Sequence, residues 1–156
     1  MLKGLHQTLT NMRTLKDMFS RAEAFALNDQ QTRPGAEHFL LAAMDMPDGK
    51  AREMLADAGG DPDQVADAIA AQYQDALAEV GVTAVPSTSD NAKPARRVIY
   101  DADASGKDVI QRLSKVKKTG PLSSADLLKS IAAQESGTAI RALQKLGVDP
   151  HRIAHT

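Results

Sequence analysis

The chain contains no cysteine and no tryptophan among its 156 residues. Without cysteine it can form neither a disulfide nor a thiolate nucleophile or metal ligand, which favours a reducing compartment. Aromatic residues make up only 3% of the sequence, so Leu, Ile, Val, Met and Ala must fill the core, as suits helices packed on helices. The sequence also lacks the apolar run of a signal peptide and any stretch apolar enough to span a bilayer. We therefore expect a cytoplasmic domain without membrane association.

The chain also lacks an excess of charge of either sign. Lys and Arg number 19 and Asp and Glu number 20, for a net charge of −1. This balance argues against a general nucleic-acid binder, whose affinity comes largely from neutralising phosphates. Hydrophobic residues make up 42% of the sequence, enough for the core of a single domain over residues 1–156. We find no pattern of nucleophile, base or paired carboxylates, and expect neither an enzyme nor a cofactor.

What the sequence does contain is an internal repeat. Residues 36–66 recur at 124–154 without a gap, at a constant offset shown by Asp61 and Asp149 (149 − 61 = 88). Apolar residues fall on apolar residues and turn residues on turn residues, as in the pairs Leu40 and Leu128, Gly59 and Gly147, and Pro62 and Pro150. Two copies of one helical unit are therefore expected to pack as one body, and without a catalytic pattern they favour a binding module.

The spacing of apolar residues by three and four predicts helices throughout, and no run alternates as a strand would. We expect an all-α fold of about eight helices, built as a tandem repeat of two four-helix units. Repeat 1 spans about 10–81, a linker about 82–90 and repeat 2 about 91–156.

Individual helix ends are predicted from residues that commonly cap helices. Thr10 is expected to cap the first helix, Pro34 to open the second and Ser136 to cap the seventh. The pairs Asp61-Pro62 and Asp149-Pro150 are expected to start the fourth and eighth helices, with Asp as the cap and Pro at the first helical position. The first helix of repeat 2 is predicted from about Val98 to Val116. It is expected to be longer than its counterpart in repeat 1, with Gly106 weakening or kinking it.

The repeat resembles the amino-terminal repeat domain of the Clp family of AAA+ unfoldases. The segment 35–41, Gly-Ala-Glu-His followed by apolar residues, is similar to the family's Gly-Thr-Glu-His motif. The segment 51–59, followed by Asp61 and Val65, is similar to the family's Ala-x-x-x-Leu-x-x-x-Gly helix end and next helix. The second copy, at 123–128 and 139–147, follows the same template less closely, and the likeness covers roughly Thr10 to Ile153.

This resemblance implies an all-α pseudo-twofold pair of four-helix repeats that docks substrates or adaptors for unfolding and degradation. The family's ATP-hydrolysing motors need a G-x-x-x-x-G-K-[ST] loop, and Gly49-Lys50 and Gly106-Lys107 lack its upstream glycine and its Ser or Thr. The resemblance therefore implies a free-standing recognition domain that binds a Clp unfoldase, its substrates or its adaptors. Such a domain would act as an adaptor, a competitor or a sequestering decoy.

Glu37 and His38 are the first candidate binding residues. Glu37 matches a glutamate with which some family members pair the guanidinium of phosphoarginine, so a small-ligand receptor for phosphoarginine or cyclic peptides is the alternative function. The second repeat, however, has Ala125 at this position and Asp126 one residue later, and Glu37 can equally be a first-turn acid that favours the helix dipole. His38 is expected to pack or cap a helix, although a hydrolase that uses both residues is a third hypothesis.

The amino terminus supplies a second candidate surface. Leu2, Leu5 and Leu9, with Thr10 beside them, form an apolar start. In the family this region helps to bind partners and cyclic-peptide inhibitors, so the resemblance implies a docking role here. The alternative is that these residues simply seal the core.

Two further clusters carry weaker expectations. Lys115, Lys117 and Lys118 form a basic cluster at a helix end, where they complement the helix dipole or dock an acidic partner surface. His151 and His155 share a helix face at metal-binding spacing, but no Glu stands between them as in a metalloprotease motif and the terminus frays. We expect no metal site.

Overall fold

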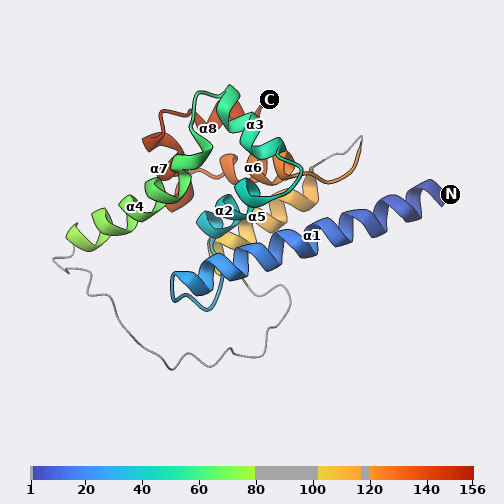
Figure 1. The fold of residues 1–156 in the computed structure, drawn as a ribbon, viewed down its shortest axis with the longest axis horizontal. Helices are drawn as coiled ribbons and strands as arrows, with labels where there is room; N and C mark the ends of the chain where they lie inside the picture. The colour runs from blue at the N-terminus through green and yellow to red at the C-terminus, as the bar shows by residue number, and fades with distance from the viewer. Residues whose placement is uncertain (1, 80–101, 117–119) are drawn as a thin grey trace.

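A computed structural model describes residues 2–79, 102–116 and 120–156. Within these ranges the chain forms eight α-helices, one short 3-10 helix and no strand, which confirms the predicted all-α class. The helices are α1 (Leu2–Asn28), α2 (Ala36–Asp45), α3 (Lys50–Asp57), α4 (Val65–Glu79, preceded by the 3-10 helix η1, Pro62–Gln64), α5 (Ala104–Lys115), α6 (Ser124–Ala132), α7 (Thr138–Lys145) and α8 (Pro150–Ala154). Figure 1 shows them wrapped around α2 and α6, with α1 along one side.

Helix α2 lies at the centre of the fold. It packs against α1, α3 and α4 of the first half and against α5, α6 and α7 of the second. Eight of its residues are buried, including Phe39 and Leu40. One cluster of buried apolar side chains runs through both halves, from Met18 to Ile153. The two halves therefore share a core, as burial of apolar surface requires of helical units too small to be stable alone.

Helix α1 is longer than predicted and only its second half belongs to this core. Met18, Phe19, Ala22 and Ala26 are buried, and the rings of Phe19 and Phe39 meet edge to face at 5.3 Å between centroids. The first half continues outward past the body of the molecule (Figure 1). The prediction that Thr10 caps α1 is wrong: its hydroxyl donates to the carbonyl of His6 one turn earlier, a bond that a Thr makes inside a helix.

Helix starts were predicted correctly where an Asp-Pro pair opens the helix. Asp61 accepts from the N–H of Asp63 at 2.9 Å, and Asp149 accepts from that of His151 at 3.0 Å. Two other predicted starts are wrong, because α2 is capped by Gly35 rather than opened by Pro34 and α7 by Gly137 rather than Ser136.

Helix α5 also differs from its prediction. It has 12 residues against 27 in α1, so it is the shorter of the two within the described residues. Gly106 lies in the first turn of α5 rather than in its interior, and its N–H donates to the capping residue Asp103 at 2.9 Å. A Cβ at this glycine would collide with the carbonyl oxygen of Pro34, so Gly106 allows the chain before α2 to cross closely over α5. Val98 and the predicted linker 82–90 lie outside the described residues.

Helix α7 keeps the register of the repeat relative to α3. Lys50 and Thr138 begin them (138 − 50 = 88), and Asp57 and Lys145 end them (145 − 57 = 88). Each half contributes four α-helices in the described residues. The start of α3 in the first half meets the start of α6 in the second.

The starts of α3 and α6 cap each other across the core. The Ser124 hydroxyl accepts from the N–H of Ala51 at 2.8 Å and donates to the Asp48 carboxylate. Asp48 also accepts from the N–H of Ser124 at 2.9 Å. These bonds satisfy helix N–H groups that have no partner within their own helices.

Ser124→Ala should therefore destabilise the protein. Ser124 is fully buried, and its loss leaves the N–H of Ala51 without an acceptor, which costs about 1–3 kcal/mol. Urea denaturation monitored by circular dichroism measures this change. Ser114→Ala is the control, because that exposed hydroxyl bonds only to a carbonyl on its own helix. Equal stability of the two variants would contradict the capping role.

The same junction should give stability a dependence on acid. Partial burial raises the pKa of Asp48, but bonds from Ser124 and Lys50 outweigh burial and hold that pKa below its usual value. A carboxyl whose pKa is lowered by folding stabilises the fold above its unfolded pKa, and this contribution disappears as the pH falls through about 4 and below. Asp48→Asn should make the unfolding free energy less sensitive to pH between about 5 and 3. An unchanged slope in denaturation curves over that range would contradict the assignment.

Candidate functional site

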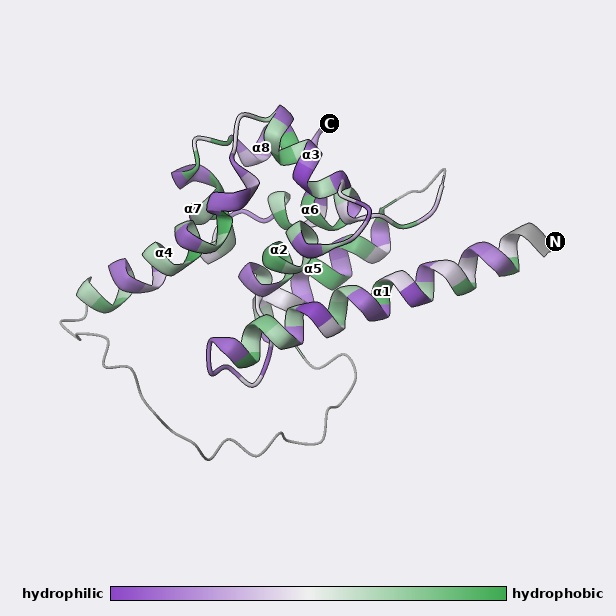
Figure 2. Ribbon diagram, in the orientation of Figure 1, coloured by the Kyte–Doolittle hydropathy of each residue, from purple (hydrophilic) through white to green (hydrophobic). Residues whose placement is uncertain are grey.

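A stripe of exposed apolar side chains marks the first half of α1. Leu5 is 61% exposed, Leu9 51% and Met12 58%, and with Leu27 at 46% they are the exposed large hydrophobic residues among those described. Leu5, Leu9 and Met12 follow one another at four and three residues, so they share one face of the helix. We refer to these three residues as the α1 stripe. Figure 2 shows its segment as alternating apolar and polar bands on the protruding part of α1.

Basic residues accompany the α1 stripe. Residues 2–16 contain Lys3, Arg13 and Lys16 and no Asp or Glu. Arg13 follows Leu9 by four residues and Lys16 follows Met12 by four, so both extend the stripe toward the body. Neither forms an ion pair with another described residue, whereas Asp17, the first acid of the helix, pairs with Arg21 at 2.9 Å. The stripe is thus apolar with a positive border.

The body of the molecule holds α1 from a different face. The side-chain oxygen of Asn11 accepts from the N–H of Leu122 at 2.9 Å and from the Gln7 amide at 3.0 Å. Asn11 is adjacent to Met12 in sequence and therefore points about 100° away from it. The loop before α6 is attached here, and the α1 stripe remains uncovered by the described part of the chain.

Glu37 and His38 lie inside the fold rather than on this surface. The N–H of Gly35 donates to Nδ1 of His38 at 2.9 Å, and because a backbone N–H can only donate, Nδ1 is the acceptor. Nε2 therefore carries the proton and donates to Asp29 at 2.8 Å. His38 is fully buried; its Nδ1 caps α2 and its Nε2 is bonded to Asp29, so both ring nitrogens have partners. The ring is not placed to act as a base.

Glu37 is tied to α4. Its carboxylate is 7% exposed and accepts from the Tyr73 hydroxyl at 2.8 Å. Burial, reinforced by this bond and by the negative charge of Glu37, raises the pKa of the Tyr73 hydroxyl, which therefore remains a donor. Beside this pair a hollow of about 350 Å³ opens to solvent, lined by Asp29, Gln31, Tyr73, Ala76 and Leu77. We refer to it as the α4 hollow.

The remaining predicted residues are dispersed. Lys115 ends α5 and is exposed, while Lys117 and Lys118 lie outside the described residues. Arg112 pairs with Asp108 at 2.9 Å, and this bond, with another from Gln134, lowers the pKa of Asp108. Leu2 begins α1 and precedes Leu5 by three residues.

The described residues contain neither a cluster of metal ligands nor a helix that could span a membrane. The rings of His151 and His155 lie 5.4 Å apart, but over residues 2–79, 102–116 and 120–156 no three His, Asp or Glu side chains gather as a metal site would require. No helix in the same ranges combines the length and the apolar character needed to cross a bilayer.

Comparison with protein families matches residues 12–111 to the Clp repeat (R) N-terminal domain. The match covers well over half of the 156 residues, and the chain belongs to this family. Family membership places the chain in a Clp system and assigns it to protein interaction. Neither the comparison with curated proteins nor that with solved structures found a match. The family match begins at Met12, so Leu5 and Leu9 precede it.

Several residues of these surfaces were not singled out for binding from the sequence. Met12 belongs to the same three- and four-residue apolar spacing as the buried Met18, so the sequence predicts only that it lies in a helix. Arg13 and Lys16 carry a usable signal, which is the absence of acids over residues 2–16. No feature of the sequence indicates the role of Tyr73, since its contact with Glu37 joins residues 36 positions apart.

The Tyr73–Glu37 bond should contribute to stability. Tyr73→Phe keeps the ring but removes the donor to a nearly buried carboxylate, which costs about 1.5–3 kcal/mol for a bond to a charged group. Thermal and urea denaturation of the two proteins measure the loss. A Tyr73→Phe variant as stable as the parent would mean that Glu37 does not depend on this bond and is available to other donors.

Proposed function

We propose that this chain is a non-enzymatic recognition module of a Clp system that docks its protein partner on the α1 stripe. The observation that carries the proposal is the exposure of Leu5, Leu9 and Met12 on one face of a helix that extends past the body. Family membership supports the system and the kind of activity, which is binding to proteins.

The energetics suit the insertion of a helix into an apolar groove. Burying an exposed Leu or Met side chain contributes about 1.5–3 kcal/mol, and anchors at i, i+4 and i+7 are the pattern that such grooves read. The helix is already formed in the free protein, so less conformational entropy is lost on binding. A surface of this kind can join a substrate or an adaptor to an unfoldase.

The sequence is suited to an adaptor, a competitor or a sequestering decoy. It contains no G-x-x-x-x-G-K-[ST] loop for nucleotide phosphates. Each of these three roles needs a binding surface and none needs catalysis by the bound module.

The structure favours the protein partner over the small-ligand alternative. One carboxylate oxygen of Glu37 already accepts from Tyr73, and Glu37 is almost buried, so little of it is open to the guanidinium of a phosphoarginine. The corresponding residue of the second repeat, Ala125, has no carboxylate. A cyclic peptide would instead have to use an apolar surface, and the α1 stripe carries the three most exposed large apolar side chains among the described residues.

Leu9→Glu should weaken partner binding by at least about tenfold, or about 1.4 kcal/mol, because it places a charge in the centre of the stripe. Binding to purified Clp unfoldase, or to substrates and adaptors recovered with the parent protein from native lysate, can be followed by biolayer interferometry. Gly4→Glu is the matched control: it adds the same charge one residue from Leu5, about 100° around the helix, where a side chain meets no other atom.

Two results would contradict the proposal. One is a parent protein that binds no unfoldase, adaptor or proteolysis substrate. The other is a Leu9→Glu protein that binds as tightly as the Gly4→Glu protein.

A further inference from the structure

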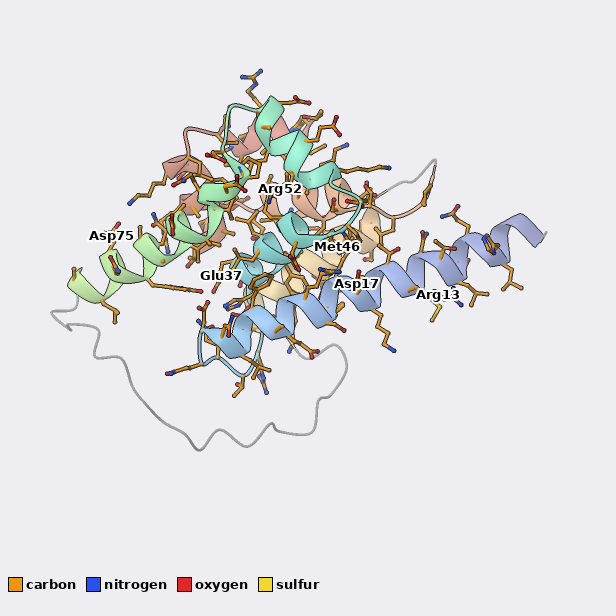
Figure 3. All side chains as sticks on the ribbon, in the orientation of Figure 1. Arg13, Asp17, Glu37, Met46, Arg52 and Asp75 are labelled. Carbon is orange, nitrogen blue, oxygen red and sulfur yellow. The ribbon has the colours of Figure 1, made fainter. Side chains whose placement is uncertain are left out.

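The two ends of the molecule carry complementary surfaces. Figure 3 places Arg13 on the protruding half of α1 and Asp75 on α4, at opposite ends of the long axis. The first end presents the α1 stripe with a basic border. The second presents the α4 hollow on an acidic helix.

The acidic character of the second end comes from α4 itself. Residues 65–79 include Asp67, Asp75 and Glu79 and no Lys or Arg. The adjoining loop adds Asp29 and Arg33, whose formal charges offset each other. Within the α4 hollow, Tyr73, Ala76 and Leu77 supply apolar surface. The hollow therefore offers what the stripe lacks, an apolar surface beside negative charge.

The α1 stripe can contact neither the α4 hollow of its own chain nor, favourably, a second α1 stripe. The stripe and the hollow of one chain lie too far apart along the molecule to meet, as Figure 3 shows. Two stripes packed against each other would set two basic helix segments side by side, since residues 2–16 contain Lys3, Arg13 and Lys16 and no acid. Like charges at short range oppose that arrangement.

We propose that the α1 stripe of one copy docks into the α4 hollow of a second copy, head to tail. Leu5, Leu9 and Met12 enter against Tyr73, Ala76 and Leu77, while Arg13 and Lys16 lie near Asp75 and Asp29. This goes beyond the function proposed above, because it requires no Clp component. Of the contact residues, Leu5 and Leu9 precede the family match, which begins at Met12, whereas those of the α4 hollow lie within it.

The geometry has a distinctive consequence. A head-to-tail contact leaves one free stripe and one free hollow on every assembly, so association does not stop at a dimer unless the rotation closes a ring. The average mass should rise with protein concentration. It should fall as salt is raised from about 0.05 to 0.5 M, because exposed charges are screened.

Mixing two single-site variants tests this arrangement. Leu9→Glu removes the stripe and keeps the hollow, and Ala76→Lys places a base in the hollow and keeps the stripe. Both sites are exposed, so both variants should fold, which circular dichroism checks. Analytical ultracentrifugation should show each variant monomeric alone and an equimolar mixture forming a one-to-one dimer. Gly4→Glu and Ala78→Lys, which alter exposed positions on other faces of α1 and α4, should associate like the parent.

Three outcomes would overturn the proposal. The first is a parent protein that stays monomeric at all concentrations up to the millimolar range. The second is an Ala76→Lys protein that still associates alone, which would indicate a stripe-to-stripe or another contact. The third is a mixture of the two variants that remains monomeric under conditions in which the parent associates.

Discussion

The fold depends on burying the start of α2 in the middle of the molecule without leaving its polar groups unsatisfied. A helix start carries N–H groups that have no partner in the helix, and leaving a buried one unpaired costs about 1–3 kcal/mol. Here the N–H of Gly35 donates to His38, and the N–H of Ala36 donates to the Ser105 hydroxyl of α5 at 3.0 Å. His38 is held in turn by Asp29 at the end of α1. One helix start thus links three segments that are distant in sequence.

The same constraint explains why Gly-Ala-Glu-His is structural here before it is anything else. A side chain at Gly35 would displace two carboxylates that already accept hydrogen bonds, since a Cβ would lie 2.7 Å from Asp103 and 2.8 Å from Glu37. His38 is the cap and Glu37 anchors Tyr73 of α4. A residue motif that resembles a ligand site is therefore occupied in positioning α1, α4 and α5 around α2. Under the function proposed above its contribution is indirect, because the bond between His38 and Asp29 holds the end of α1 against the body.

How much of this is predictable from sequence depends on whether the deciding contact is local. The helical class follows from apolar spacing. The Asp-Pro starts at Asp61 and Asp149 are also predictable, because each Asp accepts from an N–H only two residues later in the chain. The starts of α2 and α7 cannot be predicted in this way, because the choice between Pro34 and Gly35, or between Ser136 and Gly137, depends on the surrounding fold. In α2 that dependence is explicit: the N–H of Gly35 needs His38, while the Pro34 carbonyl accepts from Asp103 at 3.1 Å. The reason for Gly106 is also distant in sequence. The group that leaves no space for a side chain there is the carbonyl of Pro34, 72 residues earlier in the chain (106 − 34 = 72).

The candidate site shows this limit most clearly. Met12 and Met18 stand in one helix with similar neighbours, yet Met12 is 58% exposed and Met18 fully buried. Periodicity assigns both to a helix, but it cannot say where the body ends and so which of them it covers. The absence of acids over residues 2–16 was the available sign, because it sets this segment apart from a chain whose positive and negative charges are otherwise balanced. An apolar stripe with charge of one sign is better matched to a surface of the opposite sign on another molecule. We therefore propose that the protruding half of α1, rather than the motif at α2, is the part of this chain that selects its partner.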